Sequence, residues 1–200
     1  MIAAVILAAG LSRRMGQAKL LMLLDGRAIV RHAVEAVLAG GVDSVWVVSG
    51  PALGAIEVAL AGLDVQIVVN PMPAEGQAGS VRVGIGALPA AADSALIALG
   101  DQPMLPPSII PALLAARRTS GKPIVAPRYR DGQGNPVLFK REIFPELLRL
   151  DGDQGARPII QKDPTRVEWV ELDLAMPPDV DTPGDYEKIR AALRGGPPAG

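Results

Sequence analysis

The chain has 200 residues, of which 49% are hydrophobic and 20% are charged, and its formal net charge is -1. The length predicts one domain, the composition excludes a disordered protein, and the balanced charge argues against a general electrostatic grip on nucleic acid or on an anionic membrane. The absence of cysteine excludes disulfides, thiolate nucleophiles, zinc fingers and iron–sulfur clusters, and a single histidine excludes metal sites built from several histidines.

The apolar run at residues 2–9 is too short for a membrane span, and its positive charges, Arg13 and Arg14, follow it. A secretory signal has the reverse order. No other apolar stretch reaches the length of a span without glycine, proline or charge. We therefore expect a cytoplasmic protein that acts on neither membranes nor nucleic acid.

The first half of the chain alternates short apolar runs with segments of helical periodicity. Residues 2–7 form a run rich in valine and isoleucine, which is typical of a strand buried on both faces. Further strands are predicted at 44–48, 65–69 and 95–99, and helices at 28–38, 52–60, 80–88 and 108–118. This alternation predicts an α/β fold with a mainly parallel sheet covered by helices on both faces.

The second half is less regular. Strands are predicted at 123–126, 136–139 and 167–172, and helices at 142–150 and 183–193, the last with proline in its first turn. No linker or repeat interrupts the chain. We expect a single domain over 1–194, followed by a disordered tail at 195–200.

Two loops carry the chemistry, because ligands of open parallel sheets bind beyond the carboxyl ends of the strands. One loop, at residues 10–19, follows the first strand, and the other is the turn at Asp101. The first loop is not a P-loop, since too many residues separate Gly10 from Gly16 and no Lys-Ser/Thr pair follows. It does not match the dinucleotide fingerprint either.

The composition of the first loop indicates a phosphate site. A turn of small residues lets backbone N–H groups approach a ligand closely. Arg14 adds a planar fork for phosphate oxygens, and Lys19 adds a compact point charge. The alternative is a solvated basic loop, which would not explain its place directly after a buried strand.

Five fragments together resemble the MobA-like nucleotidyltransferase family, and within it the molybdenum cofactor cytidylyltransferases. Residues 7–19 read LAAGLSRRMGQAK, which is similar to the family signature LAxGxSxRMGxxK. The other fragments are LGDQP at 99–103, GNPVLF at 134–139, GDQGAR at 152–157 and DVDTP at 179–183. The resemblance implies a three-layer Rossmann-like nucleotidyltransferase fold, in which about 1–105 bind the nucleotide and about 106–194 bind the acceptor.

The resemblance implies that a nucleoside triphosphate lies over the first loop, with Arg14, Lys19 and Asp101 as catalytic residues. Asp101 and Asp181 would bind Mg²⁺, which commonly takes one or two carboxylates together with substrate phosphates. Two alternatives stay open. Asp179 competes with Asp181 as the second ligand, and an aspartate before Thr-Pro is also a helix-start signal. Asp101 is alternatively a turn residue or a helix cap before Pro103.

No catalytic base is evident. The only histidine, His32, falls in a predicted helix and is interpreted as structural. An acceptor that is already a phosphate monoester needs little deprotonation, since its second pKa is about 6. Transfer onto such an acceptor can depend on positioning and charge neutralisation alone.

The resemblance also indicates which nucleotide base is bound. Residues 7–10 read LAAG, as in the cytidylyltransferase branch of the family, whereas the guanylyltransferase branch tends to carry LAGG. The methyl group of Ala9 would narrow the pocket for a purine. Ser80 resembles a serine that contacts cytosine, or it is the N-cap of the predicted helix, and Asn70 faces the nucleotide or is a turn residue. The full nucleotide-binding set that the resemblance implies is Leu7, Ala8, Ala9, Gly10, Ser12, Arg14, Lys19, Asn70, Gly76, Gly79, Ser80 and Asp101.

Asn135, Pro136, Asp153 and Arg157 are the expected acceptor-binding residues; for Arg157 a surface ion pair is the alternative. The resemblance implies CTP and a molybdopterin-type cofactor as substrates, Mg²⁺ as cofactor, and a client molybdoenzyme or its maturation factor as partner. The alternatives are a relative that uses GTP, one that acts on a sugar or isoprenoid-precursor phosphate, or a non-catalytic cofactor carrier. The failed dinucleotide fingerprint argues against a nicotinamide-dependent oxidoreductase.

Overall fold

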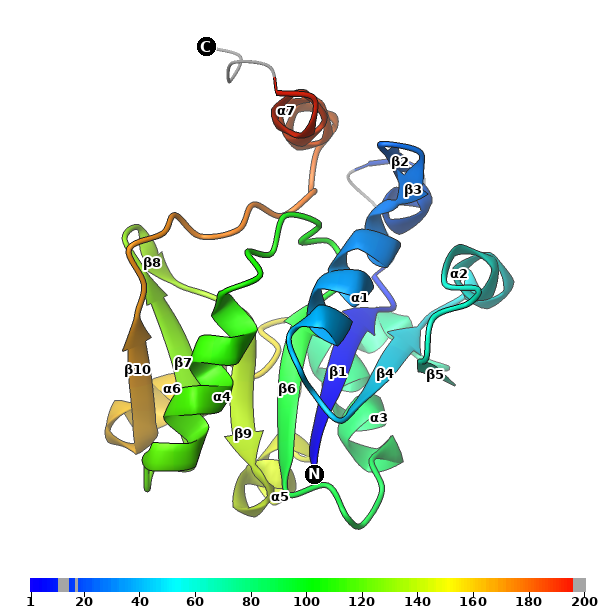
Figure 1. Cartoon of the computed structure of the whole chain (residues 1–200). Helices are drawn as coiled ribbons and strands as arrows, with labels where there is room; N and C mark the ends of the chain where they lie inside the picture. The colour runs from blue at the N-terminus through cyan, green and yellow to red at the C-terminus, as the bar shows by residue number, and fades with distance from the viewer. Residues whose placement is uncertain (11–14, 17, 196–200) are drawn as a thin grey trace.

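A computed structural model describes residues 1–10, 15–16 and 18–195 of the chain. Its centre is an eight-stranded sheet in the order β10-β7-β9-β6-β1-β4-β5, with β8 paired to β7 (Figure 1). The strands are β1 Ile2–Ala8, β4 Ser44–Ser49, β5 Gln66–Val69, β6 Ser94–Leu99, β7 Ile124–Tyr129, β8 Gly132–Gln133, β9 Val137–Lys140 and β10 Val167–Glu171. Only β8 and β9 pair antiparallel to their neighbours in this sheet. The predicted α/β class with a mostly parallel sheet is therefore confirmed.

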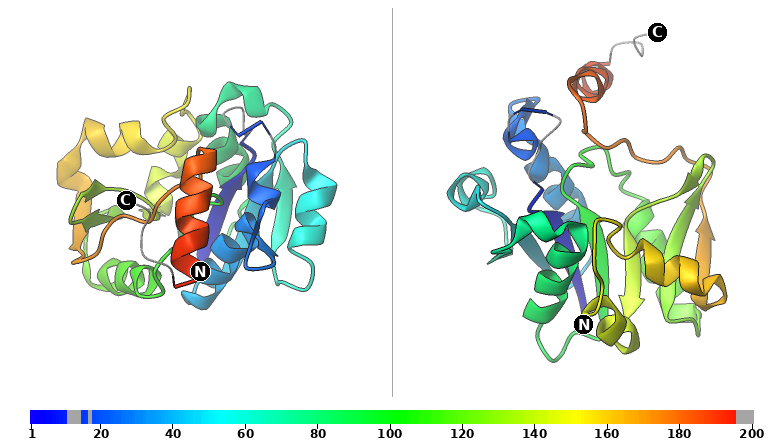
Figure 2. Two further views of the ribbon diagram at one scale, coloured as in Figure 1. Left: turned by 90° about the horizontal axis from the view of Figure 1, so that it is seen from above. Right: turned by 180° about the vertical axis from the view of Figure 1, so that it is seen from behind.

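Helices cover both faces of the sheet, which gives three layers (Figures 1 and 2). One face carries α1 and α4, and the other carries α3, α5 and α6. The helices are α1 Ile29–Ala39, α2 Leu53–Ala59, α3 Gln77–Ala87, α4 Ile109–Thr119, α5 Phe144–Leu147, α6 Arg157–Lys162 and α7 Pro183–Leu193. Short 3-10 helices lie at η1 Lys19–Leu21, η2 Pro73–Glu75, η3 Arg141–Ile143 and η4 Pro164–Arg166. Two-residue strands β2 Leu23–Leu24 and β3 Arg27–Ala28 pair as a separate hairpin.

The core is split by the central sheet, because successive residues of a strand point to opposite faces. Ile6 of β1 packs in one layer with residues of α1 and α4, whereas Val5 packs in the other with Val81 of α3. Both β1 side chains are fully buried. The run at residues 2–7 reads as continuously apolar because both of its faces are covered.

The chain departs from the predicted elements at several short segments. Helix α3 begins at Gln77 rather than at Ser80, after an N-cap at Gly76 that makes no side-chain hydrogen bond. The predicted helix at 142–150 is a 3-10 turn followed by the four-residue α5, with proline in its first turn. Helix α6 and strands β2, β3 and β8 were not expected.

A long connection without helix or strand joins β10 to α7 and carries the predicted residues Asp179 and Asp181. The crossing segment (residues 172–182) leaves β10 and passes over the carboxyl ends of β7 and β6 and the amino end of β9 to reach α7 (Figures 1 and 2). The Val180 N–H donates to the Asp101 carbonyl at 3.0 Å, which joins this segment to the turn after β6. Thr182 then caps α7 in a capping box with Asp185. The predicted bounds of this helix are confirmed.

Beyond α7 the structure describes only residues 194 and 195. The Gly195 N–H donates to the Ala192 carbonyl just beyond α7, and 196–200 of the predicted tail lie outside the described residues. None of the helices within the described ranges is both long and apolar enough to cross a membrane.

Candidate functional site

The two predicted loops meet because β1 and β6 are neighbours in the sheet. Leu7 of β1 pairs with Leu99 of β6, so both strands end at the same level. The Gly100 N–H donates to the Leu7 carbonyl at 3.0 Å, and a Cβ at Gly100 would lie 3.0 Å from that same oxygen. Glycine thus permits the close approach that places Asp101 beside the first loop.

Lys19 links the first loop to both predicted metal ligands. Its Nζ atom lies 2.6 Å from Oδ2 of Asp101 and 2.9 Å from Oδ1 of Asp181. The lysine side chain is 11% exposed, compared with 21% for Asp101 and 38% for Asp181. The structure therefore brings together three of the residues that the sequence predicts, from η1, the turn after β6 and the end of the crossing segment.

The two aspartates of this cluster stabilise the charged form of Lys19. Burial of Lys19 disfavours its charged form, but the attraction and hydrogen bonds of Asp101 and Asp181 outweigh that cost and raise the pKa of the lysine. Asp179 lies two positions before Asp181 in the crossing segment and is exposed as a whole residue. Desolvation by the chain around its carboxyl group, followed by the charge of Asp101, raises its pKa, while Gln102 opposes the shift by a hydrogen bond. Asp181, and not Asp179, contacts the lysine.

The donor set of the cluster fits a divalent cation. A positive charge, the Lys19 ammonium, is already held where the carboxylates of Asp101 and Asp181 meet. Among the described residues, no three His, Cys, Asp or Glu side chains come close enough to hold a metal ion. Two carboxylates are nevertheless the protein share that Mg²⁺ commonly takes, since water and substrate phosphates complete its shell. The pair therefore suits a cation that arrives with a triphosphate.

Small residues at the end of β1 and directly after it pack tightly at the same edge of the sheet. Ala8 and Ala9 are 5% and 3% exposed, and Gly10 is exposed. A Cβ at Gly50, which follows β4, would lie 3.0 Å from the Ala9 carbonyl oxygen. Glycine at position 50 thus permits the segments after β1 and β4 to pack closely. Two predicted residues of the loop, Ser12 and Arg14, lie outside the described residues.

The predicted base-binding residues gather at the beginning of α3. Nδ2 of Asn70 donates to Oγ of Ser80 at 3.1 Å, and Oδ1 of Asn70 accepts from the Met72 N–H at 2.9 Å. Asn70 therefore makes the turn contact that the alternative interpretation named, and its place at the nucleotide stays a prediction. Ser80 lies inside α3, so its interpretation as an N-cap is wrong. Gly79 adjoins this pair, with Nδ2 of Asn70 3.6 Å from a built Cβ.

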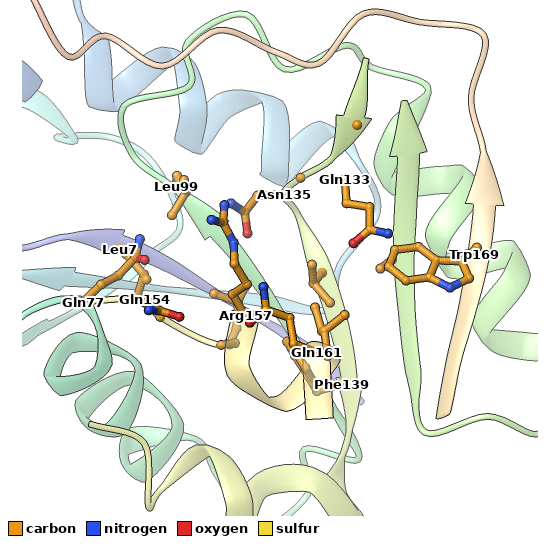
Figure 3. A pocket seen from close by; sticks show the side chains of 18 residues that line it. Leu7, Gln77, Leu99, Gln133, Asn135, Phe139, Gln154, Arg157, Gln161 and Trp169 are labelled. Carbon is orange, nitrogen blue, oxygen red and sulfur yellow. The ribbon is translucent and has the colours of Figure 1, made fainter. Parts of the chain in front are cut away.

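A cavity of about 530 Å³ opens beside the same strand ends, on the α3 and α6 side of the sheet (Figure 3). Leu7 and Leu99 lie at one end of it and Trp169 of β10 at the other. Two of the predicted acceptor residues, Asn135 and Arg157, line it. Arg157 makes no ion pair with another described residue, which argues against the alternative of a surface ion pair.

The other two predicted acceptor residues lie apart from the cavity wall. Pro136 is buried and is joined to Asn135 by a cis peptide bond. Asp153 sits against Gly76 at the beginning of α3, so close that a Cβ on this glycine would overlap its carboxylate. The Ala78 N–H donates to the Gly152 carbonyl at 3.1 Å and fastens the two segments together.

Several lining residues were missed by the sequence analysis. Those with carboxamide or indole side chains are Gln77, Gln133, Gln154, Gln161 and Trp169. Gln154 stands inside the fragment GDQGAR, so this fragment could have indicated it. The others come from α3, β8, α6 and β10, and only the folded chain brings them to one wall. His32 is absent from the site: its Nε2 lies 2.7 Å from the Leu24 carbonyl oxygen, in the structural role expected for it.

Comparison with known proteins places these features in a family. Residues 4–167 match the MobA-like NTP transferase domain. The purine catabolism protein PucB of Bacillus subtilis is 31% identical over 94% of this chain and 96% of its own, and nicotine blue oxidoreductase of Paenarthrobacter nicotinovorans is 32% identical over 89% and 91%.

A solved structure agrees with the sequence relatives. Rv0371c of Mycobacterium tuberculosis superposes with a TM-score of 0.85 at 30% identity, covering 94% of this chain and 97% of its own. A second structure of that protein is a complex with manganese, with a TM-score of 0.84 at 28% identity over 96% and 98% of the two chains. With a family match across most of its length, the chain belongs to the MobA-like NTP transferase family.

Proposed function

We propose that this protein transfers CMP from CTP to the phosphate of a molybdopterin-type cofactor, forming its cytosine dinucleotide and pyrophosphate. The observation that carries the proposal is the cluster of Lys19, Asp101 and Asp181 at the carboxyl end of the sheet, next to an open cavity. The choice of CTP rests on Ala8 and Ala9. The choice of acceptor rests on the resemblance of the fragments GNPVLF and GDQGAR, which supply Asn135 and Arg157.

The reaction is a displacement at the α-phosphorus of CTP. An oxygen of the acceptor phosphate forms a bond to this phosphorus, and the bond from the phosphorus to the bridging oxygen breaks, so pyrophosphate leaves with both electrons. No proton has to be removed by a side chain, because the acceptor is largely ionised at neutral pH. This agrees with a site that holds carboxylates and a lysine but not His32.

The residues of the chain have separable roles in this reaction. Asp101 and Asp181 would hold Mg²⁺, and Lys19 would contact the triphosphate. When bound, the ion supplies charge neutralisation on the phosphate oxygens. The manganese bound by the mycobacterial relative supports a divalent cation at such a site. The turn of small residues after β1 offers its backbone N–H groups to the same phosphates.

Product analysis tests the proposal. The protein is incubated with Mg²⁺, molybdopterin cofactor and each of the four nucleoside triphosphates in turn, and products are identified by mass. We expect the cytosine dinucleotide and pyrophosphate in equal amounts. Transfer to a sugar phosphate or an isoprenoid-precursor phosphate in parallel reactions, without transfer to molybdopterin, would contradict the acceptor. A carrier would bind the finished dinucleotide without forming it.

A further assay tests for oxidoreductase activity, because one of the relatives is named an oxidoreductase. NADH and NADPH are supplied with molybdopterin cofactor in the absence of any triphosphate, and absorbance of the reduced nicotinamide is followed. We expect no oxidation above that of a protein-free control. Turnover of the nicotinamide would favour oxidoreductase chemistry over nucleotidyl transfer.

A further inference from the structure

The cavity is unusually rich in carboxamide side chains. The chain contains seven glutamines, and four of them line this one cavity together with one of its two asparagines. They are Gln77, Gln133, Asn135, Gln154 and Gln161, and Figure 3 shows them around Arg157. None of these side chains makes a hydrogen bond with another residue that the structure describes. Scattered surface glutamines would not gather in this way, so the cavity wall presents a set of available donors and acceptors.

The charge of the wall is low and of one sign. Arg157 is its only charged side chain, since no lysine, histidine or carboxylate lines the cavity among the described residues. A carboxamide both donates and accepts hydrogen bonds. It therefore pairs with a ring edge on which donors and acceptors alternate, as carboxamides do with the edge of adenine. Such a wall favours an uncharged heterocycle that carries one anionic part.

Aromatic and aliphatic side chains complete the cavity. Phe139, Ile97 and Ala126 come from β9, β6 and β7 and form apolar lining. At the far end, the Cζ atom of Arg128 lies 4.8 Å from the ring centroid of Trp169, so a guanidinium covers part of the indole and holds its orientation. Gln133 lies close to this indole in Figure 3. A planar ring system can thus meet an indole and a carboxamide together.

The two ends of the cavity differ in a way that orients a ligand. Leu99 lies at the near end, and Asp101 follows it by two residues, so the near end opens toward the predicted triphosphate site. Trp169 and Gln133 lie at the opposite end, and Arg157 lies between the ends (Figure 3). An acceptor whose phosphate reaches the near end would place the remainder of the molecule along this wall.

We propose that Gln133, Gln161 and Trp169 are specificity residues that recognise the ring of a pterin-type heterocycle, while Arg157 binds the anionic part of the same ligand. This deepens the function proposed above and rests on it for the direction of the phosphate. The binding of the ring itself does not depend on nucleotide or metal. It can therefore be measured without the transfer reaction.

Tryptophan fluorescence provides the first measurement. The chain has two tryptophans, Trp46 in β4 and Trp169 at the cavity. A 6-substituted pterin phosphate is titrated into the full chain without nucleotide or metal, and ribose 5-phosphate serves as the ligand that has a phosphate but lacks the ring. We expect the pterin to quench the emission and the sugar phosphate to leave it unchanged. The Trp169→Phe variant should lose most of the quenching, and Trp46→Phe should keep it.

Fluorescence anisotropy of the pterin itself gives a second measurement that does not need Trp169. Gln133→Ala and Gln161→Ala should each weaken binding by about 2- to 10-fold, the range for loss of one hydrogen bond. Gln66→Ala, on the exposed edge strand β5, is the matched control and should bind as the unmodified chain does. Arg157→Gln should reduce the advantage of the pterin phosphate over the uncharged pterin.

The outcomes separate this inference from the proposed function. If the pterin fails to bind, or if both glutamine variants bind it normally, while the enzyme still transfers CMP to molybdopterin, the assignment of these residues is overturned and the function stands. If the pterin binds with the expected losses but no nucleotide is transferred, the proposed function fails and the recognition of the ring stands.

Discussion

The ammonium nitrogen of Lys19 lies 2.6 Å from Oδ2 of Asp101, although 82 positions separate the two residues in the chain. Asp181 approaches the same nitrogen to 2.9 Å from a further segment. One cation thus joins the loop after β1, the turn after β6 and the end of the crossing segment. This relationship makes the role of each residue testable by itself.

The first prediction concerns Asp101. Asp101→Asn removes one negative charge from the pair that would hold the divalent cation, so turnover should fall by at least about 10²-fold, the scale for loss of one electrostatic stabiliser. Pyrophosphate release at saturating Mg²⁺ measures it. Asp64→Asn, at an exposed position, is the control. Asp181→Asn should also lose activity. Near-normal turnover of Asp101→Asn would remove this carboxylate from the mechanism.

The second prediction separates metal binding from triphosphate binding at Lys19. The lysine occupies the place between two carboxylates where the divalent cation would bind, and a unit charge about 4 Å away contributes about 4 kcal/mol at an effective dielectric constant of 20. Solvent screens part of this electrostatic energy, because the Asp181 side chain is partly exposed. Even about a third of this energy, about 1.4 kcal/mol, is 10-fold in affinity, so Lys19→Met should bind Mn²⁺ at least about 10-fold more tightly without nucleotide, as followed by electron paramagnetic resonance, yet bind CTP more weakly.

The conservative variant sharpens this test. Lys19→Arg keeps the charge but replaces a point charge by a planar fork, so it should not restore full activity. Arg14→Ala should also weaken binding of the triphosphate. If Lys19→Met bound Mn²⁺ no better and CTP no worse than the unmodified chain, the lysine would be a structural ion-pair partner only.

The sheet, and the nearness of Lys19 to Asp101, could be predicted from the sequence because their signals are local, whereas Asp181 was expected beside them only from the resemblance of the fragment DVDTP. β1 and β6 are apolar runs followed by loops with charge, and parallel strands end at one edge, so Lys19 and Asp101 were expected near one another. α7 was predicted correctly because Pro183 and the capping residues mark its beginning. Such signals lie within a few residues of the element that they define.

The cavity wall could not be predicted, because its residues meet only through tertiary structure. Gln77 was missed since α3 begins after Gly76, a cap without a side-chain hydrogen bond, and a glycine-rich first turn gives no helix signal. Helix α6 spans six residues with Pro158 in its first turn, too short for a visible period. Gln133 stands in β8, which has two residues. A glutamine on a short element is typical of solvent-exposed loops.

The third prediction concerns the packing of α3 against the sheet. A Cβ at Gly84 in α3 would overlap Cγ1 of Val5 and lie 3.0 Å from Cγ2 of Val48, and both valines are fully buried. Gly84→Ala should therefore destabilise the protein by about 1–3 kcal/mol through overpacking. Gly86, in the same helix, has nothing within 4 Å of a built Cβ. Gly86→Ala should stabilise by about 0.5–1 kcal/mol.

Urea unfolding of the two variants measures this difference directly. Both substitutions gain the same helix propensity, so the gap between their midpoints reports the contact with β1 and β4. Equal stability of the two variants would show that α3 does not pack on the sheet as closely as described.

The last prediction concerns the base. Ala9 is 3% exposed, belongs to the same buried cluster as Val48 and Ala78, and directly follows β1 at the edge of the predicted nucleotide site. A purine would have to displace the alanine methyl group or shift the end of the strand. Pocket shape discriminates by about 1–3 kcal/mol per methylene, and each buried polar edge left unmatched costs about 1–3 kcal/mol. CTP should therefore be preferred over GTP by at least about 10- to 10²-fold.

Competition between equal concentrations of CTP and GTP, with the two dinucleotides counted by mass, measures this preference. Ala9→Gly should reduce it without abolishing transfer, because the backbone that faces the phosphates is kept. Ala3→Gly is the matched control: it removes a fully buried methyl group from the opposite end of β1, so it should lower stability and leave the ratio of products unchanged. A wild-type enzyme that makes mostly the guanine dinucleotide would assign the chain to the other branch of the family, while the roles of Lys19 and Asp101 would stand, because they act on the triphosphate that both nucleotides share.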